Sequence, residues 1–280
     1  MRLRRRFAAV TIALTLALGS VGLSATAEAH RRPPKPKDVQ LQVLSFNDFH
    51  GYLQPPSGTD ATLGAALDPS LTPVGGAEYL ASTLDRLRAK AKYSQTVTAG
   101  DLIGGTPFLS GLFHDEPAVE SLNAMGLDVS SVGNHEFDEG KTELRRMGYG
   151  GCHPVEGCFD ADGYSGAEYD YLAANVTYKP GVKTPRVKGE PTYGWWGHVA
   201  STGRTVLPPS EIKLVQGIPV GFIGMTLEGT PELVAQAGIQ DVDFKDEVET
   251  INKYAAELNK QGVKSIVALI HEGGLPANGA

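Results

Sequence analysis

Four short segments of the sequence carry residue types that bind divalent metal ions. They are Asp48 with His50, residues 100–101, residues 133–138 and His271. Imidazole nitrogens mixed with carboxylate or amide oxygens suit Zn, Mn, Co or Fe better than a soft thiolate site does. Asp48 and His50 are two residues apart, so on an extended segment both side chains point the same way and can hold one ion.

The second and third of these segments fit a centre with two ions. The carboxylate of Asp101 has two oxygens, which can bridge ions about 3.5–4 Å apart as in two-metal hydrolases. Asn134 offers a neutral amide oxygen, and Asp138 lies three residues after His135, where on a helical turn it can orient the imidazole. Each motif alone is weak, because D-x-H and Gly-Asp recur by chance and Gly-Asn-His-Glu also suits a simple turn. Their ordered occurrence, each at the end of an apolar stretch, predicts a two-metal centre.

Strands and helices alternate along the chain. The hydrophobic pattern predicts strands over residues 39–46, 96–99, 129–132, 171–176, 218–225 and 263–270, and helices over residues 78–91, 117–125 and 244–261. The predicted apolar face of the last helix contains Phe244, Val248, Ile251, Ala255 and Leu258. The alternation predicts an α/β fold with sheets covered on both faces. In such sheets ligands bind beyond the carboxyl ends of the strands, which is where the four segments lie.

Composition and missing motifs exclude several other classes of protein. Hydrophobic residues make up 41% and charged residues 20% of the 280-residue chain, as in a globular protein. The formal net charge of −7 argues against a nucleic-acid-binding surface. The sequence contains no G-x-x-x-x-G-K-[ST], G-x-G-x-x-G, G-x-S-x-G or H-E-x-x-H motif. Their absence excludes the classes that these motifs mark: nucleoside triphosphatases, dinucleotide enzymes, serine esterases and zincins.

The first 29 residues have the pattern of a secretory signal peptide. Four arginines within residues 2–6 precede an uncharged apolar stretch over residues 7–23, and residues 27–29 form a small-x-small cleavage site. A membrane anchor is the alternative, but the stretch is short for a span of about 20 residues. We expect export to the cell envelope or the medium by the Sec or the twin-arginine route, and no membrane contact after cleavage. Residues 30–38 then form a basic, Pro-rich tether.

Export bears on the charge balance and on the two cysteines. Removal of the signal peptide takes away four Arg and one Glu and changes the net charge from −7 to −10. An anionic phosphate substrate would therefore need a concentrated local positive charge, such as a bound metal ion. Cys152 and Cys158 are the only cysteines, and in an exported protein we expect them to form a disulfide, with two free thiols as the alternative.

The segments LSFNDFHGYLQP, TAGDLIGGTPFLSGLF, MGLDVSSVGNHEFDEG and VALIHEGG carry a family resemblance. Over about residues 39–274 the chain resembles the calcineurin-like metallophosphoesterases. Within them it is similar to the catalytic domain of secreted bacterial 5′-nucleotidases, also called UDP-sugar hydrolases. The resemblance implies a sandwich of two mixed β-sheets flanked by helices, incomplete at the C-terminus.

The resemblance also implies a set of metal ligands. Asp48 and His50 would bind a first ion, Asp101 would bridge the two ions, and Asn134 and His271 would bind the second. The cofactors would be two divalent ions of Zn, Mn, Co or Fe.

A catalytic pair follows from the same resemblance. His135 with Asp138 would form the catalytic dyad, and Asn134 and His135 would contact the phosphoryl group of the substrate. The implied reaction is hydrolysis of the phosphomonoester of an extracellular nucleotide by a water that the two ions activate.

The sequence departs from the family pattern after His271. Family members continue to a G-H-x-[HQ] strand end and to a second domain that holds the nucleoside, whereas this sequence stops at Ala280. We therefore expect a catalytic domain over residues 39–280 that lacks the final metal-ligand strand and the substrate domain. The alternatives are a 2′,3′-cyclic-nucleotide phosphodiesterase, a UDP-sugar hydrolase or an inactive metal-binding fragment. The expected partner is a small-molecule nucleotide or phosphate ester, not a nucleic acid polymer, and the oligomeric state is left open.

The remaining aromatic and histidine residues suggest no further site. Trp195 and Trp196 could stack on a base, but large aromatic residues mostly pack in the core. His114, His153 and His198 lack a ligand-like context, and we expect surface residues or residues with satisfied hydrogen bonds.

Overall fold

The computed structural model describes residues 38–57, 74–182 and 205–273. All elements named below lie in one unit, Val39–Ala280. The predicted signal peptide, most of the tether, Trp195, Trp196 and His198 lie outside the described residues.

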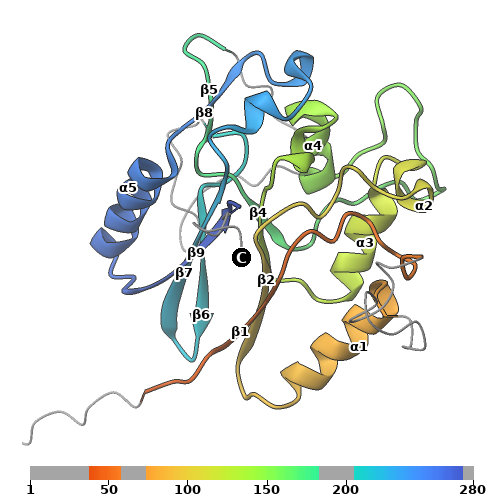
Figure 1. Cartoon of the computed structure of the whole chain (residues 1–280). Helices are drawn as coiled ribbons and strands as arrows, with labels where there is room; N and C mark the ends of the chain where they lie inside the picture. The colour runs from red at the N-terminus through yellow and green to blue at the C-terminus, as the bar shows by residue number, and fades with distance from the viewer. Residues whose placement is uncertain (1–37, 58–73, 183–204, 274–280) are drawn as a thin grey trace, which may run out of the picture. The chain divides into compact units, whose positions relative to one another are not determined.

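A four-stranded parallel sheet carries most of the candidate residues. Its strands, in spatial order, are β1 (Gln42–Phe46), β2 (Ser94–Thr98), β3 (Val129–Ser131) and β4 (Asp170–Leu172). Phe46 pairs with Thr98 and Thr98 with Ser130, so β1, β2 and β3 end at nearly the same level. The helices on its outer side are α1 (Ala77–Arg88), α2 (Phe108–Gly111), α3 (Glu116–Ala124) and α4 (Gly140–Tyr149) (Figure 1).

A second, mixed sheet packs against the first. Its strands are β6 (Ser210–Val215), β7 (Ile218–Thr226) and β9 (Ser265–His271). β6 and β7 are antiparallel and are joined at Gln216 and Gly217, which both have positive φ as a tight hairpin turn requires. β7 and β9 are parallel, and helix α5 (Glu247–Lys260) connects to β9 and covers the outer face of this sheet. A small antiparallel pair is formed by β5 (Val176–Tyr178) and β8 (Val242–Phe244).

Apolar side chains fill the space between the two sheets. Val97 and Leu172 from the first sheet contact a cluster that includes Phe222 and Leu269 from the second. On the outer face of the second sheet, Leu258 of α5 packs in a cluster with strand residues. The layers are therefore helix, sheet, sheet and helix (Figure 1), and the predicted α/β fold is confirmed. Among the described strands the first sheet is wholly parallel and only the second is mixed.

Two predictions of local structure are wrong. The predicted strand over residues 171–176 is divided between β4 and β5, which belong to different sheets. The predicted helix over residues 244–261 begins at Glu247, because the Asp246 side chain caps it by accepting a hydrogen bond from the Glu249 N–H at 2.7 Å. Phe244 accordingly ends β8, and Val248, expected on the buried face, is 65% exposed.

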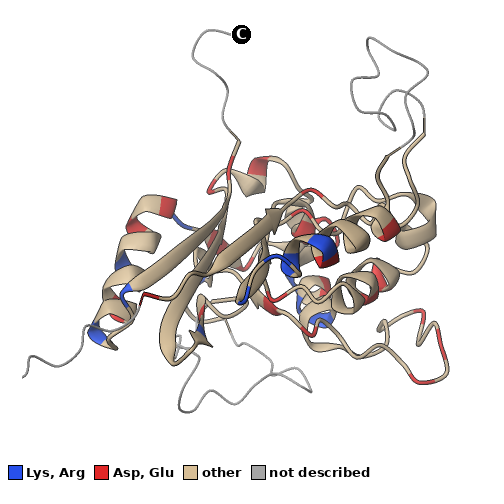
Figure 2. Ribbon diagram, turned by 90° about the horizontal axis from the view of Figure 1, so that it is seen from below, with Lys and Arg blue, Asp and Glu red and all other residues tan. Residues whose placement is uncertain are grey.

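Figure 2 shows acidic residues distributed over the helices and loops of the described chain. None of the helices in the described ranges has the length and apolar character needed to cross a bilayer.

A buried carboxyl group lies where the two sheets meet. Glu211 on β6 is 7% exposed, and Asp170 at the start of β4 pairs with Lys213. Burial and the Asp170 carboxylate raise the pKa of Glu211 to about 7, against a smaller opposing effect of Lys213. The folded protein thus holds a proton over a pH range in which an ordinary Glu has lost it.

We predict that Glu211→Gln removes a pH dependence of stability. The folded pKa of about 7 lies above the usual 4.5, so the contribution of Glu211 is fully present below the lower value and lost as the pH rises through the higher one. E211Q should exceed wild type in unfolding free energy by about 1–3 kcal/mol at high pH and match it in acid. Urea unfolding at a series of pH values measures this, and parallel pH curves for the two proteins would contradict it.

Candidate metal centre

The carboxyl ends of four strands meet at one edge of the sandwich. Asp48 and His50 follow β1, Asp101 follows β2, Asn134 and His135 follow β3, and His271 is the last residue of β9. The loop after β1 is bonded to the loop after β2, since the backbone N–H groups of Asp48 and His50 donate to Gly100 and Asp101 carbonyls at 3.1 Å. The structure therefore brings together residues that are far apart in the sequence, as predicted.

Two glycines allow the loops after β2 and β3 to touch. A Cβ atom at Gly100 would lie 2.2 Å from the backbone nitrogen of Gly133. A Cβ atom at Gly133 would lie 2.1 Å from Oδ1 of Asp101. Any other residue at either position would force the loops apart, which explains why each motif begins with Gly.

The carboxylate of Asp101 lies at the middle of the cluster. Its Oδ1 accepts the backbone N–H of His135 at 3.0 Å, while Oδ2 lies 3.1 Å from Nε2 of His271 and 3.8 Å from Nε2 of His50. The side chain is 5% exposed. Burial alone would raise the pKa of Asp101, but the hydrogen bonds from His271 and His135 outweigh it and hold the pKa below its usual value.

The ring of His50 is oriented by the loop after β2. Its Nδ1 lies 2.7 Å from the carbonyl oxygen of Gly104, so this nitrogen is the donor and Nε2 is left as the ligand atom. The Gly104 N–H in turn donates to the Asp115 carboxylate at 3.0 Å. Nε2 of His50 lies 3.8 Å from Oδ1 of Asp48.

His135 and Asp138 form a hydrogen-bonded pair at the start of the segment after β3. A short 3₁₀ helix over His135–Phe137 places Nδ1 of His135 2.8 Å from Oδ2 of Asp138. Burial lowers the pKa of His135, but the bond to Asp138 and the charges of Asp138 and Asp101 outweigh it, and the pKa is raised. The His135 ring also meets the His50 ring edge-on, with centroids 4.9 Å apart.

The donor atoms fit divalent metal ions in two groups. Ligand atoms of His50, Asp101 and His135 lie within 4.8 Å of one another, and so do those of Asp48, Asp101 and His271. Asp101 belongs to both groups. Asp48 and His50, which the resemblance assigns to one ion, fall in different groups. Imidazole and carboxylate donors in this mixture suit Zn, Mn, Co or Fe. His135, which the sequence suggested only as a catalytic residue, also lies at ligand distance.

A residue without a role in the sequence analysis joins the loops behind this cluster. The Glu136 carboxylate, 2% exposed, accepts hydrogen bonds from the backbone of the loops after β2 and β3. Burial and the Asp101 charge raise the pKa of Glu136, and these hydrogen bonds oppose the rise. The motif Gly-Asn-His-Glu contained the residue, but a local motif does not show which distant N–H groups it binds.

A second cluster lies beside the dyad and has a different character. Nδ1 of His114 lies 2.7 Å from Oε2 of Glu139 and its Nε2 lies 3.4 Å from Oε1 of Glu156. The rings of His114 and His153 are stacked, with centroids 4.0 Å apart and planes 9° apart. The ligand atoms of His114, Glu139 and His153 also lie within 4.8 Å of one another, but His114 is already paired with two carboxylates and its ring is stacked on that of His153. Both histidines have satisfied hydrogen bonds, as expected from the sequence.

Cys152 and Cys158 are paired in the structure, with Cα atoms 4.4 Å apart. The short loop that they close also carries His153 and Glu156, so it lies against the His114 cluster.

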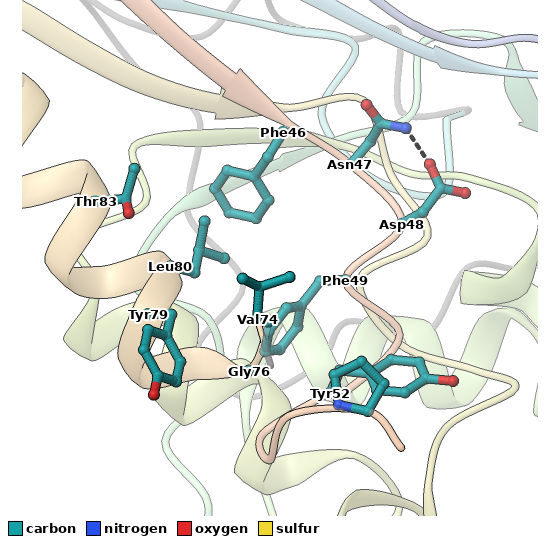
Figure 3. Close-up of a pocket in the computed structure, with 12 residues that line it drawn as sticks. Phe46, Asn47, Asp48, Phe49, Tyr52, Val74, Gly76, Tyr79, Leu80 and Thr83 are labelled. Atoms are coloured by element: carbon teal, nitrogen blue, oxygen red, sulfur yellow. Dashed lines mark hydrogen bonds between the residues drawn. The ribbon is translucent and has the colours of Figure 1, made fainter. Parts of the chain in front are cut away.

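An apolar pocket of about 600 Å³ lies next to Asp48. Figure 3 shows Phe46, Leu80 and Tyr79 lining it and the Asn47 amide bonded to the Asp48 carboxylate. Tyr79 is 54% exposed. The candidate centre thus has an open aromatic surface beside it.

Three relatives share most of this chain. It is 37% identical to Endonuclease YhcR of Bacillus subtilis over 86% of this chain and 18% of that protein. It is 35% identical to an uncharacterized protein of the pqq-V 5′ region of Acinetobacter calcoaceticus, over 76% of this chain and 97% of that protein. It is 30% identical to a probable 5′-nucleotidase of Treponema pallidum, over 84% of this chain and 33% of that protein. No family model matches the sequence.

The structure of the Haemophilus influenzae NAD nucleotidase is similar as well, with a TM-score of 0.61, 26% identity, and coverage of 84% of this chain and 35% of that one. The two-sheet sandwich with His and Asp side chains at its strand ends is the calcineurin-like phosphoesterase fold. Within that class, the relatives of this chain include 5′-nucleotidases of Treponema, Haemophilus and Thermus. The chain spans 18% of the length of YhcR and 33% of the Treponema protein.

We predict that Asp101→Asn weakens metal binding more widely than Asp48→Asn does. Asp101 belongs to both ligand groups and Asp48 to one, and an amide neither carries charge nor bridges as a carboxylate does. In a calorimetric titration with Mn²⁺, Asp101→Asn should lose affinity at both positions by about 10-fold or more, and Asp48→Asn at one. Equal losses in the two variants would contradict a bridging role for Asp101.

Proposed function

We propose that this chain forms the catalytic core of an exported, metal-dependent phosphomonoesterase that acts on nucleotides. The observation that carries the proposal is the sharing of Asp101 between two ligand groups beside the His135–Asp138 pair. Asp48 and His50, whose Oδ1 and Nε2 atoms lie 3.8 Å apart, would hold one ion and His271 the other, with Asp101 common to both. Asp48 also lies at ligand distance from His271. Asn134, directly before His135 at the end of β3, would complete the second ion's ligands.

The chemistry of the centre follows from these donors. Two divalent ions bound there would supply positive charge and an activated water, as in two-metal hydrolases. Asp138 holds Nδ1 of His135, so Nε2 is the ring atom free to donate a hydrogen bond to a phosphoryl oxygen and to stabilise its charge. The Asp138 carboxylate stabilises the imidazolium in that position. Without bound cations, Asp48 and Asp101 would repel a phosphate.

The substrate class and the location are part of the proposal. The names of the Treponema and Haemophilus relatives favour a nucleotide substrate, and the exposed aromatic pocket beside Asp48 favours an organic ester. The predicted signal peptide over residues 1–29, the tether over 30–38 and the Cys152–Cys158 pair support export. We propose residues 39–280 as one catalytic domain. The compact unit Val39–Ala280 supports this boundary.

The endonuclease name of YhcR raises a second substrate class, nucleic acid. The net charge of −7 of the whole chain opposes a polyanion. A substrate panel of AMP, 2′,3′-cyclic AMP, UDP-glucose and a single-stranded DNA oligonucleotide separates these possibilities. We expect release of phosphate from AMP to be the fastest reaction.

We predict that His135→Ala lowers the rate far more than it lowers the metal content. Loss of a group that stabilises charge on the phosphoryl oxygens costs about 10²–10³-fold in rate, whereas Asp48, His50, Asp101 and His271 remain as ligands. The test measures metal content and hydrolysis of AMP and an aryl phosphate with Mn²⁺, Co²⁺ or Zn²⁺. If metal content and rate fell by the same factor, His135 would act mainly as a metal ligand. A wild-type chain that binds two ions and hydrolyses nothing would be a metal-binding fragment.

A further inference from the structure

Glu136 accepts four hydrogen bonds from three separate segments of the chain. Its Oε2 accepts the backbone N–H of Asp101 at 3.0 Å and that of Gly133. Its Oε1 accepts the N–H of Leu102 and the hydroxyl of Tyr171, both at 2.8 Å. These donors come from the loop after β2, the loop after β3 and strand β4. With two donors on each oxygen, the carboxylate fills the positions at which it can accept.

The bond to Asp101 holds a backbone that is otherwise unfavourable. Asp101 has φ of +52°, in the left-handed region that residues with a Cβ rarely adopt. Such a conformation costs of order 1 kcal/mol or more and persists only when the surroundings enforce it. Oε2 of Glu136 enforces it by binding the Asp101 N–H and the Gly133 N–H together. The direction of the Asp101 side chain depends on this conformation.

We infer that Glu136 is a positioning residue that sets where the Asp101 carboxylate stands between the two ligand groups. It acts through the backbone of Asp101 and Gly133 and is not itself a ligand of the proposed ions. The inference rests on the proposed function, because the spacing that it concerns is that of the two proposed ions. A Glu136 that only filled the core would affect stability and leave that spacing unchanged.

Glu136→Gln tests this with little change in volume. The amide replaces one acceptor oxygen by a donor, so at least one of the N–H groups of Asp101, Leu102 and Gly133 loses its partner. Glu211→Gln is the matched control, because it makes the same substitution at a buried site on β6 in the other sheet. Tyr171→Phe is a milder variant, since it removes one of the four donors and keeps the three N–H groups.

The probe is Mn²⁺ alone, followed by titration and by electron paramagnetic resonance. Two Mn²⁺ ions that share a carboxylate give an exchange-coupled spectrum, which a change in stability alone does not alter. In Glu136→Gln we expect Mn²⁺ affinity to fall by about 10- to 100-fold and the coupled signal to be lost, while thermal unfolding stays cooperative. Glu211→Gln should keep the wild-type affinity and spectrum.

Two coupled Mn²⁺ ions bound by Glu136→Gln with wild-type affinity would overturn the inference. A wild-type chain that binds no Mn²⁺ would instead count against the proposed function, so the two failures are distinguishable. If Glu136→Gln does not unfold cooperatively, Tyr171→Phe becomes the test. It should weaken Mn²⁺ binding by about 2- to 10-fold, the value of one hydrogen bond, and unchanged affinity and coupling there would overturn the inference.

Discussion

The contact between two backbone segments, at Gly100 and Gly133, is the constraint on which the candidate centre depends. Neither position has room for a Cβ atom. Their approach brings the His135 N–H to one oxygen of Asp101 and leaves the other oxygen facing the rings of His50 and His271. The ligand arrangement is therefore set by main-chain packing at the edge of a parallel sheet, and the side chains need only the correct chemical type.

The site could be predicted from sequence because its residues follow directly after apolar strands, whose carboxyl ends must meet in a parallel sheet. Local patterns failed where distant contacts decide the structure. Asn175 is fully buried, and its side chain bonds the backbone of Thr226 and Lys245, which divides the apolar stretch around it between two sheets. The partners of Glu136 lie in another loop, so no periodicity indicates its role.

In the segment between Asn134 and Gly140, residues of the proposed catalytic pair alternate with residues that hold the segment in place. His135 and Asp138 face the cluster, while Phe137 between them is fully buried in the core. Glu136 accepts hydrogen bonds from the neighbouring loop on one side, and Glu139 pairs with His114 on the other. A dyad in which each reactive side chain has an anchored neighbour has little freedom to rotate out of position, which is what preorganised catalysis requires.

Asp48 and His271 come from the first and last strands of the described unit. During synthesis, β1, β2 and β3 emerge early, yet the ligand set stays incomplete until β9 pairs with β7. The ion that His271 would hold can bind only a chain folded through β9, and would stabilise that state by mass action. Capture of this ion is then a late step in folding. Because metal availability strongly influences which ion a site acquires, the compartment in which β9 docks would select the metal.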